Sequence, residues 1–208
     1  MGVLIVFEGG DGAGKSTQSK ILAENISLYK VPVLLSREPG STKIGESIRN
    51  ILQTSRDLTQ LTELLLFSAA RSQLVETVVL PALESGQVVI CDRFTSSTVA
   101  YQGYGRGLDL DLINSLNIRS TAGVRPDLTV LLDIPIETGI LRRRNKTPDV
   151  FESAQDEFHA RVRKGYLEQA SQDPAKWLVL DGTNEVAVLS ETIWARVKPL
   201  IDRVMTGI

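Results

Sequence analysis

A glycine-rich stretch near the start of the chain carries the residue types of a phosphate-binding loop. Its spacing matches the pattern G-x-x-x-x-G-K-[ST], which ends here at Lys15 and Ser16. Glycines let the backbone curl so that its N–H groups form an anion nest at the start of a helix. Lys15 would add a mobile positive charge for the β- and γ-phosphates, and the Ser16 hydroxyl would ligate Mg²⁺. The residues expected to contact a nucleoside triphosphate are Gly9, Gly10, Asp11, Gly12, Ala13, Gly14, Lys15, Ser16 and Thr17.

The segments of the chain before and after this loop are those that the motif requires. An apolar run at 3–7 predicts a strand before it, and a periodic segment at 19–28 predicts a helix after it. A second apolar run, 88–91, ends in Asp92 and therefore has the form of a Walker B strand. The carboxylate of Asp92 would then hold Mg²⁺ directly or through water. The alternative is an ordinary aspartate at the end of a strand.

Two arginines follow the ends of two further predicted strands. Arg37 comes after the run 33–36, and Arg93 comes directly after Asp92. Ligands of parallel α/β sheets bind at the carboxyl ends of the strands, so both guanidinium groups should arrive beside the triphosphate site. Each arginine alone could belong to an ordinary ion pair. Together they favour a second anion site, and hence a phosphorylated acceptor that needs positioning and charge neutralisation rather than a strong base.

Phe67 and Arg71 lie four residues apart in a long predicted helix at 59–83 and so share one helix face. That face could simply meet solvent. Alternatively, a planar base could stack on Phe67 while Arg71 hydrogen-bonds its edge. Asp11 is unusual in a phosphate-binding loop because a carboxylate repels phosphate. We interpret it as contacting a hydroxyl group of the second substrate.

The segment 142–156 is charged, is poor in apolar side chains and contains Pro148, which is typical of a flap. It begins with Arg142, Arg143 and Arg144. Basic residues at a helix end are often only solvated and favoured by the helix dipole. Beside a phosphoryl-transfer site they can instead supply an arginine finger from a closing lid, so Arg142 and Arg144 are catalytic candidates.

The pattern of apolar runs predicts the elements that must position these residues. Five runs of strand length lack polar alternation, and helical patterns lie between them. We therefore expect one α/β domain over residues 1–208, a doubly wound, five-stranded parallel sheet with helices on both faces and a short lid. No internal repeat or linker divides it. The predicted strands are 4–7, 33–36, 88–91, 128–132 and 177–180.

Composition limits the class of protein. The 208 residues are 42% hydrophobic and 23% charged, which is typical of a soluble globular protein. A formal net charge of −2 argues against extended nucleic-acid binding, which normally needs a basic surplus. The single cysteine, Cys91, excludes an internal disulfide, and no apolar run suggests a membrane span or signal peptide, so we expect a cytoplasmic protein. The single histidine, His159, lacks partners at metal-ligand spacing, so no protein-built zinc site is expected.

The ordered set of motifs resembles the bacterial thymidylate kinases, which are P-loop nucleoside monophosphate kinases. The motifs are 8–16, 37–40, 67–71, 92–94, 101–103, 125–128 and Arg161-x-Arg163-x-x-Tyr166. They extend from the first strand to the helix before Trp177, and their combination is far more specific than the P-loop alone. The resemblance implies transfer of the γ-phosphoryl group of ATP to dTMP, giving dTDP for the dTTP pathway. It also implies Mg²⁺ as cofactor and a homodimer.

The resemblance further implies roles for individual residues. The thymine ring would stack on Phe67 and be read by Arg71, and Asp11 would hold the sugar 3′-hydroxyl. The dTMP-binding positions would be Arg37, Arg49 and Arg93 at the phosphate, Asp11 and Tyr101 at the sugar, and Phe67, Arg71, Ser97 and Gln102 at the base. The catalytic positions would be Lys15, Asp92, Arg93, Arg142 and Arg144, with Ser16 and Asp92 at Mg²⁺.

Two positions depart from the family pattern. Relatives often carry an arginine after the lid aspartate, but here Val150 follows Asp149. Some relatives place a catalytic arginine where this chain has Gly12, and its absence resembles the subclass whose lid supplies the arginine. The sequence therefore leaves open which lid arginine acts.

Two other functions remain as alternatives. A deoxynucleoside kinase would use a similar loop, but it would need a carboxylate base to deprotonate a neutral hydroxyl. A regulatory GTPase would need a guanine motif, which the segment 145–149 matches only superficially because no strand precedes it.

Overall fold

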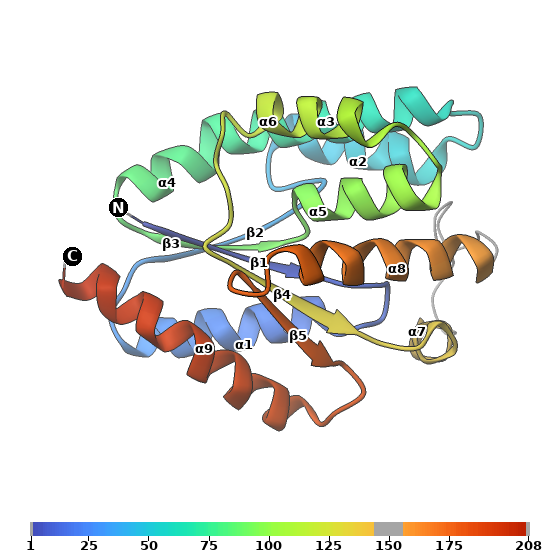
Figure 1. The fold of residues 1–208 in the computed structure, drawn as a ribbon. Helices are drawn as coiled ribbons and strands as arrows, with labels where there is room; N and C mark the ends of the chain where they lie inside the picture. Colours follow the sequence, from blue (N-terminus) through green and yellow to red (C-terminus); the bar gives the residue numbers. More distant parts are fainter. Residues whose placement is uncertain (1, 144–155, 207–208) are drawn as a thin grey trace.

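The computed structural model describes residues 2–143 and 156–206 as an α/β fold (Figure 1). Within these residues one five-stranded sheet is formed, with all strands parallel in the order β2-β3-β1-β4-β5. The strands are β1 Val3–Glu8, β2 Val33–Arg37, β3 Val88–Asp92, β4 Leu128–Asp133 and β5 Trp177–Asp181. The predicted parallel sheet is confirmed, and every predicted strand lies within one residue of its expected ends.

Helices cover both faces of this sheet. In Figure 1, α1 Lys15–Leu28 and α9 Val186–Thr206 lie below it, and α7 Ile136–Arg143 follows the carboxyl end of β4. The upper layer consists of α2 Lys43–Thr54, α3 Gln60–Leu74, η1 Val75–Val79, α4 Leu80–Glu84, α5 Thr95–Thr98, η2 Val99–Gly105, α6 Leu110–Ser120 and α8 Asp156–Gln172. The doubly wound arrangement is therefore the one expected.

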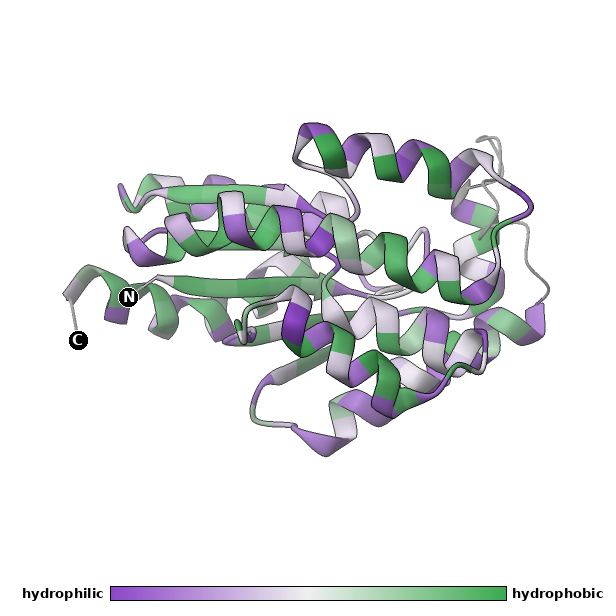
Figure 2. Ribbon diagram, turned by 90° about the horizontal axis from the view of Figure 1, so that it is seen from above, coloured by the Kyte–Doolittle hydropathy of each residue, from purple (hydrophilic) through white to green (hydrophobic). Residues whose placement is uncertain are grey.

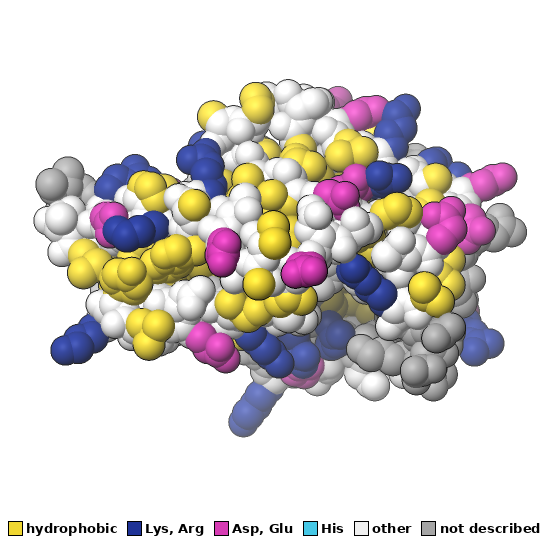
Figure 3. Space-filling view, turned by 90° about the horizontal axis from the view of Figure 1, so that it is seen from below, with side chains coloured by type: hydrophobic (Ala, Val, Ile, Leu, Met, Phe, Trp, Pro, Cys, Tyr) yellow, Lys and Arg dark blue, Asp and Glu magenta, His cyan; other side chains and the backbone are white. Residues whose placement is uncertain are grey.

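The hydropathy of the elements follows their position. The strands are hydrophobic along most of their length, whereas hydrophobic and hydrophilic residues alternate on the helices (Figure 2). On the lower surface, hydrophobic side chains are interspersed with side chains of both charges (Figure 3). A parallel sheet that is covered on both faces needs apolar side chains on both, which explains the continuous apolar runs in the sequence.

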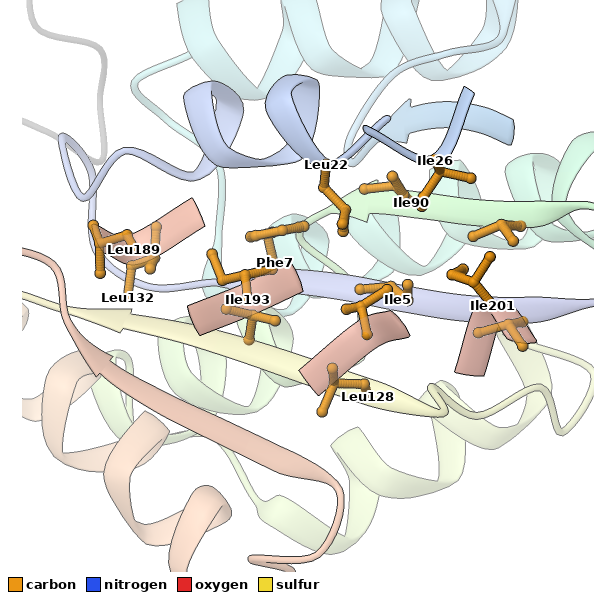
Figure 4. Close-up of a cluster of buried hydrophobic side chains, with 14 of the residues drawn as sticks. Ile5, Phe7, Leu22, Ile26, Ile90, Leu128, Leu132, Leu189, Ile193 and Ile201 are labelled. Carbon is orange, nitrogen blue, oxygen red and sulfur yellow. The ribbon is translucent and has the colours of Figure 1, made fainter. Parts of the chain in front are cut away.

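Side chains of β1 alternate between the two layers, as strand geometry requires. Ile5 and Phe7 are fully buried against residues of α1 and α9, and Figure 4 shows this cluster. Leu4 and Val6 are buried in a second cluster with residues of α3, η1, α4 and β3. Burial of one such side chain contributes roughly 1.5–3 kcal/mol, so both layers stabilise the central strand that carries the glycine loop.

The segments α3, η1 and α4 form one helical run, Gln60–Glu84, with π-helical geometry in its middle. This run is long and apolar enough to cross a membrane by length and composition, which simple inspection of the sequence did not suggest. Here it packs beside α2 and α6, and its residues Leu74, Val75 and Val79 are fully buried in the upper core against β1 and β3. It is therefore a core helix of this fold.

The register of the strands brings the chemically interesting residues to one edge. Phe7 of β1 lies opposite Asp92 of β3, and Asp92 lies opposite Arg37 of β2. The segments that follow these three strands therefore leave the sheet side by side. The site is built from them.

Candidate active site

The loop between β1 and α1 has the geometry of a phosphate-binding nest. Gly9 has a φ of 135°, and a Cβ at this position would lie 2.4 Å from the carbonyl oxygen of Leu132, so a larger residue does not fit. Gly14 caps α1 with a φ of 99°, and no side chain of the described residues caps this helix. Its first-turn N–H groups therefore face the loop opening, where an anion is favoured.

Lys15 is buried in this loop. Its Nζ donates to the carbonyl oxygens of Gly9, at 3.1 Å, and Gly10, at 2.9 Å. Burial, and then the nearby charge of Arg93, lower the pKa of Lys15 to about 8. A bound phosphate would stabilise the charged form.

Ser16 and Asp92 are in contact across the loop. The Ser16 hydroxyl donates to Oδ2 of Asp92 at 2.5 Å. A hydroxyl and a carboxylate oxygen are ligands that Mg²⁺ prefers, and Mg²⁺ usually completes its shell with phosphates and waters. The described residues contain no cluster of three or more His, Cys, Asp or Glu side chains for a metal, so a magnesium ion here would depend on the nucleotide.

Arg93 lies at the centre of the site, with a left-handed backbone φ of 72° that is rare for a residue with a Cβ. Its Nη2 contacts Oδ1 of Asp11 at 2.5 Å and the hydroxyl of Tyr101 at 3.2 Å. Its Nη1 donates to the Gly9 carbonyl oxygen at 3.2 Å and to the hydroxyls of Ser97 and Tyr166. The side chain of Arg93 is 17% exposed, so the guanidinium group is fixed but still reachable.

Two adjoining hollows open around Arg93. The first, which we call the phosphate cleft, is lined by Asp11, Gly12, Gly14, Lys15, Ser16, Thr17, Arg37, Glu38, Arg49, Asp92, Arg93 and Arg142. The second, which we call the base pocket, is lined by Asp11, Glu38, Pro39, Arg49, Leu52, Gln53, Phe67, Arg93, Ser97, Thr98, Tyr101 and Gln102. Four residues line both hollows: Asp11, Glu38, Arg49 and Arg93. Two ligands could therefore meet end to end.

Most residues predicted for the dTMP site line these hollows, but Arg71 does not. Arg71 is 1% exposed and is held by protein acceptors. Its Nε donates to Oε2 of Glu38 at 2.8 Å, and its Nη1 donates to Oδ1 of Asn117, also at 2.8 Å. Its Nη2 donates to Thr98 Oγ1, at 2.9 Å, and to the Phe94 carbonyl oxygen. Arg71 therefore lies directly behind Thr98, a wall residue of the base pocket.

Glu38 accepts a hydrogen bond from Arg71 and lines both hollows. It is buried, and its Oε1 has no hydrogen-bond partner among the described residues. Burial raises the pKa of Glu38 to about 7, against the opposing charge and hydrogen bond of Arg71. The Glu38-Pro39 peptide bond is cis.

The other predicted arginines differ in how firmly they are held. The Arg37 side chain is 54% exposed and pairs with Glu46, with Nη2 3.0 Å from Oε1. Arg49 donates to the carbonyl oxygen of Pro39 at 3.0 Å.

Gln102, another residue predicted for the dTMP site, is buried. Its amide group donates to Oε1 of Glu63 at 2.8 Å, and Glu63 does not line the base pocket.

Arg142 reaches back from α7 to the glycine loop. Its Nη1 donates to the carbonyl oxygen of Gly12 at 3.3 Å and to that of Gly182 at 3.0 Å. Gly12 has a φ of 80°, and a Cβ there would lie 2.8 Å from the carbonyl oxygen of Gly139, so an arginine at this position would displace α7. Arg144, Pro148 and the Asp149-Val150 pair lie outside the described residues.

Two residues of the site were missed as functional candidates. Glu8 ends the apolar strand β1, and Tyr166 belongs to α8; both contact the residues around Arg93. A carboxylate at the end of an otherwise apolar, fully buried strand was the available signal for Glu8. Both residues also belong to the family motifs, at 8–16 and at Arg161-x-Arg163-x-x-Tyr166, which assign them no role.

Comparisons with known proteins agree with this geometry. Residues 7–193 match the family model described as thymidylate kinase. The thymidylate kinase of Desulforudis audaxviator (strain MP104C) is 47% identical over 203 residues, which cover 96% of this chain and 92% of the relative. That of Roseiflexus castenholzii (strain DSM 13941 / HLO8) is 42% identical over 217 residues, covering 97% and 95%.

A solved structure is also similar. The crystal structure of thymidylate kinase from Ehrlichia chaffeensis shares 40% sequence identity with this chain at a TM-score of 0.74, covering 86% of this chain and 92% of that one. These matches decide between the three functions that the sequence left open. The chain belongs to the thymidylate kinase family, enzymes with ATP and dTMP as substrates that phosphorylate dTMP to dTDP.

Proposed function

We propose that the phosphoryl group passes from ATP to dTMP at the junction of the phosphate cleft and the base pocket. The observation that carries this proposal is that Asp11, Glu38, Arg49 and Arg93 line both hollows. The phosphates of ATP bind the glycine loop and Lys15, and the phosphate of dTMP enters from the other side. In-line transfer needs this end-to-end arrangement.

The chemistry in this proposal is charge neutralisation. The acceptor phosphate is an anion at neutral pH, and the loose transition state spreads charge over the transferred group. The guanidinium of Arg93 is held by Asp11 and Tyr101, so it needs little reorganisation when charge develops. Arg142 contacts the loop at Gly12 and is proposed as a lid arginine that acts in catalysis, together with Arg144.

A magnesium ion completes the proposed site. Ser16 and Asp92 would hold it together with the phosphates of ATP, and when bound it neutralises phosphate charge. The Ser16–Asp92 hydrogen bond supports this assignment, because the two oxygens already lie side by side.

The base pocket would receive the nucleoside of dTMP. Phe67 lies in its wall and would stack on thymine, and Arg71 would read the base edge past Thr98. Asp11 and Tyr101 would meet the sugar, with the 3′-hydroxyl on Asp11. Arg37, Arg49 and Arg93 would position the phosphate, and Ser97 and Gln102 lie near the base in this proposal.

We also propose that the chain forms one domain with a lid over about 142–156, acts in the cytoplasm and pairs with a second copy. The paired surface would be the outer face of α2 and α3, which pack side by side. Ile44 and Ile51, seven residues apart on α2, are 53% and 42% exposed, and Leu61 and Leu65, four apart on α3, are 48% and 47% exposed. Each pair shares a helix face, and such apolar faces are typical of interfaces.

The test of the site is a panel of acceptors in a coupled assay of ADP release. With ATP and Mg²⁺, dTMP should be phosphorylated fastest, dUMP more slowly, and thymidine at background rate. Phe67→Ala should raise KM for dTMP by about 10-fold or more, because base–aromatic stacking contributes roughly 1–3 kcal/mol. The same panel run on Leu28→Ala, which alters an exposed residue of α1, is the control. An unchanged KM for dTMP in Phe67→Ala would reject the base pocket.

A further inference from the structure

A buried carboxylate lies beside Arg93 and has no part in the mechanism above. Glu8 is 0% exposed, and four donors surround it. Its Oε1 accepts from the backbone N–H groups of Phe94, at 2.9 Å, and Ser97, at 3.1 Å. Its Oε2 accepts from the Ser97 hydroxyl at 2.6 Å and from the Tyr166 hydroxyl at 3.0 Å. Such a carboxylate holds the segment that follows Arg93.

The same two hydroxyl groups contact Arg93. Its Nη1 donates to Tyr166 Oη at 3.1 Å and to Ser97 Oγ at 3.2 Å. A hydroxyl has one proton to donate and two lone pairs to accept, whereas a guanidinium can only donate. The two hydroxyls also lie 2.8 Å apart, so each gives its single proton either to Glu8 or to the other hydroxyl, and each accepts from Arg93 through a lone pair. At most one proton can lie between the two hydroxyls, so Glu8 accepts at least one of the two and orients the hydroxyl pair.

The protonation states of Glu8 and Tyr166 support this hydrogen-bond arrangement. Burial raises the pKa of Glu8, while Arg93, Ser97, Phe94 and Tyr166 all favour its ionised form. The pKa of the Tyr166 phenol is raised well above its usual value by burial and by Glu8, so the phenol keeps its proton. A neutral phenol between a carboxylate and a guanidinium can bond both at once.

We propose that Glu8 and Tyr166 are positioning residues for Arg93: they orient its guanidinium toward the transferring phosphoryl group through the Tyr166 and Ser97 hydroxyls. This inference rests on the proposed role of Arg93. The effect is indirect, because neither residue lines the phosphate cleft. Tyr166 reaches Glu8 from α8, 158 residues along the chain, so the arrangement joins α8 to the end of β1.

The test is a double-mutant cycle between Tyr166→Phe and Arg93→Ala, read as kcat and as KM for each substrate. Tyr166→Phe removes one oxygen and should lower kcat about 10-fold, because a hydrogen bond to a charged group is lost. KM for ATP should stay within about twofold of wild type. In the Arg93→Ala background the same change should have no further effect on kcat. This loss of additivity is a readout that a purely structural role would not give.

Tyr104→Phe is the matched control. Its hydroxyl donates to Oε2 of Glu168 at 2.7 Å, so it too joins α8 to another element through a tyrosine–glutamate hydrogen bond, here η2 rather than β1, and Arg93 takes no part in it. It should leave kcat unchanged. Glu8→Gln, which keeps the shape and adds a donor, should lower kcat at least as much as Tyr166→Phe. If Glu8→Gln does not fold, Ser97→Ala removes the other hydroxyl and should lower kcat in the same non-additive way.

The outcomes separate the two proposals. If Arg93→Ala keeps wild-type turnover, the proposed role of Arg93 is wrong. If Arg93→Ala is slow but Tyr166→Phe and Ser97→Ala turn over like wild type, only the positioning role is wrong. If Tyr166→Phe lowers kcat by the same factor in the wild-type enzyme and in the Arg93→Ala variant, the positioning role is also wrong.

Discussion

The guanidinium of Arg93 and the carboxylate of Asp11 form an ion pair, Nη2 to Oδ1, across 82 residues of sequence. Asp11 belongs to the glycine loop, and Arg93 follows β3. The pair explains how an acidic residue is tolerated in a phosphate-binding loop, because its charge is balanced by a guanidinium. It also fixes Arg93 at the junction of the two hollows.

Arg93→Ala should lower kcat by on the order of 10² or more, because a preorganised charge donor is lost where negative charge develops. Steady-state kinetics with ATP and dTMP measure this. Arg203→Ala changes an exposed arginine of α9 and should behave like wild type. Near wild-type turnover of Arg93→Ala would contradict the assignment.

Asp11→Asn should weaken the preference for a substrate with a 3′-hydroxyl, because a neutral amide replaces the charged acceptor. In wild type, dTMP should have a KM about 10-fold below that of its 3′-deoxy analogue, since a hydrogen bond to a charged group is lost with the analogue. In Asp11→Asn the two KM values should approach each other. kcat should also fall, because Arg93 loses its carboxylate partner. If the KM values of the two substrates still differ about 10-fold in the variant, the sugar contact lies elsewhere.

The activity of the free enzyme should decline above about pH 8. The pKa of Lys15 is lowered to about 8, first by burial and then by Arg93, so Lys15 loses its proton above that pH. Phosphate binding needs the charged form, so kcat/KM for ATP should fall about tenfold per pH unit beyond 8. kcat itself should fall at higher pH, because bound phosphate favours the charged form. A kcat/KM that stays flat to pH 9.5 would contradict this.

Glu38 should make the stability of the fold depend on pH. Its pKa is about 7 in the folded chain, above the usual 4.5 of a glutamate in an unfolded chain, so the folded state binds the extra proton between these pH values. Its contribution to stability is therefore complete below pH 4.5 and is lost as the pH rises through 7, at up to about 1.4 kcal/mol per pH unit. Urea unfolding from pH 5 to 8 should show this slope in wild type. Glu38→Gln cannot titrate there, so an identical slope in that variant would assign it to other groups.

Leu65→Glu should convert the proposed dimer to monomers, because a charge would be buried at the centre of an apolar interface. Sedimentation velocity at micromolar concentration measures the change. Val188→Glu places the same charge at a 50% exposed position of α9 and should leave the dimer intact. A wild-type chain that sediments as a monomer would reject the proposed surface.

Local patterns in the sequence were enough for the strands, the glycine loop and the family. Each strand is a short apolar run, and the loop depends on glycines at fixed spacing, so neighbours along the chain decide both. Sequence spacing also placed Phe67 and Arg71 on one helix face. The structure separates them: Phe67 lines the base pocket, whereas Arg71 is buried behind Thr98 with Glu38.

Only the tertiary structure decided which side chains contact one another in the site. Ser97 and Tyr101 follow Arg93 closely in the chain, but its partners in the glycine loop and in α8 lie 84 and 73 residues away, and no local pattern links those segments to it. The register of the parallel strands brings Glu8 and Asp92 to one edge of the sheet, and the packing of α8 over that edge delivers Tyr166. A sequence determines which side chains can carry charge or donate a proton. Which of them meet is set by long-range packing, because contacts between residues 73 to 158 apart depend on how whole strands and helices are stacked.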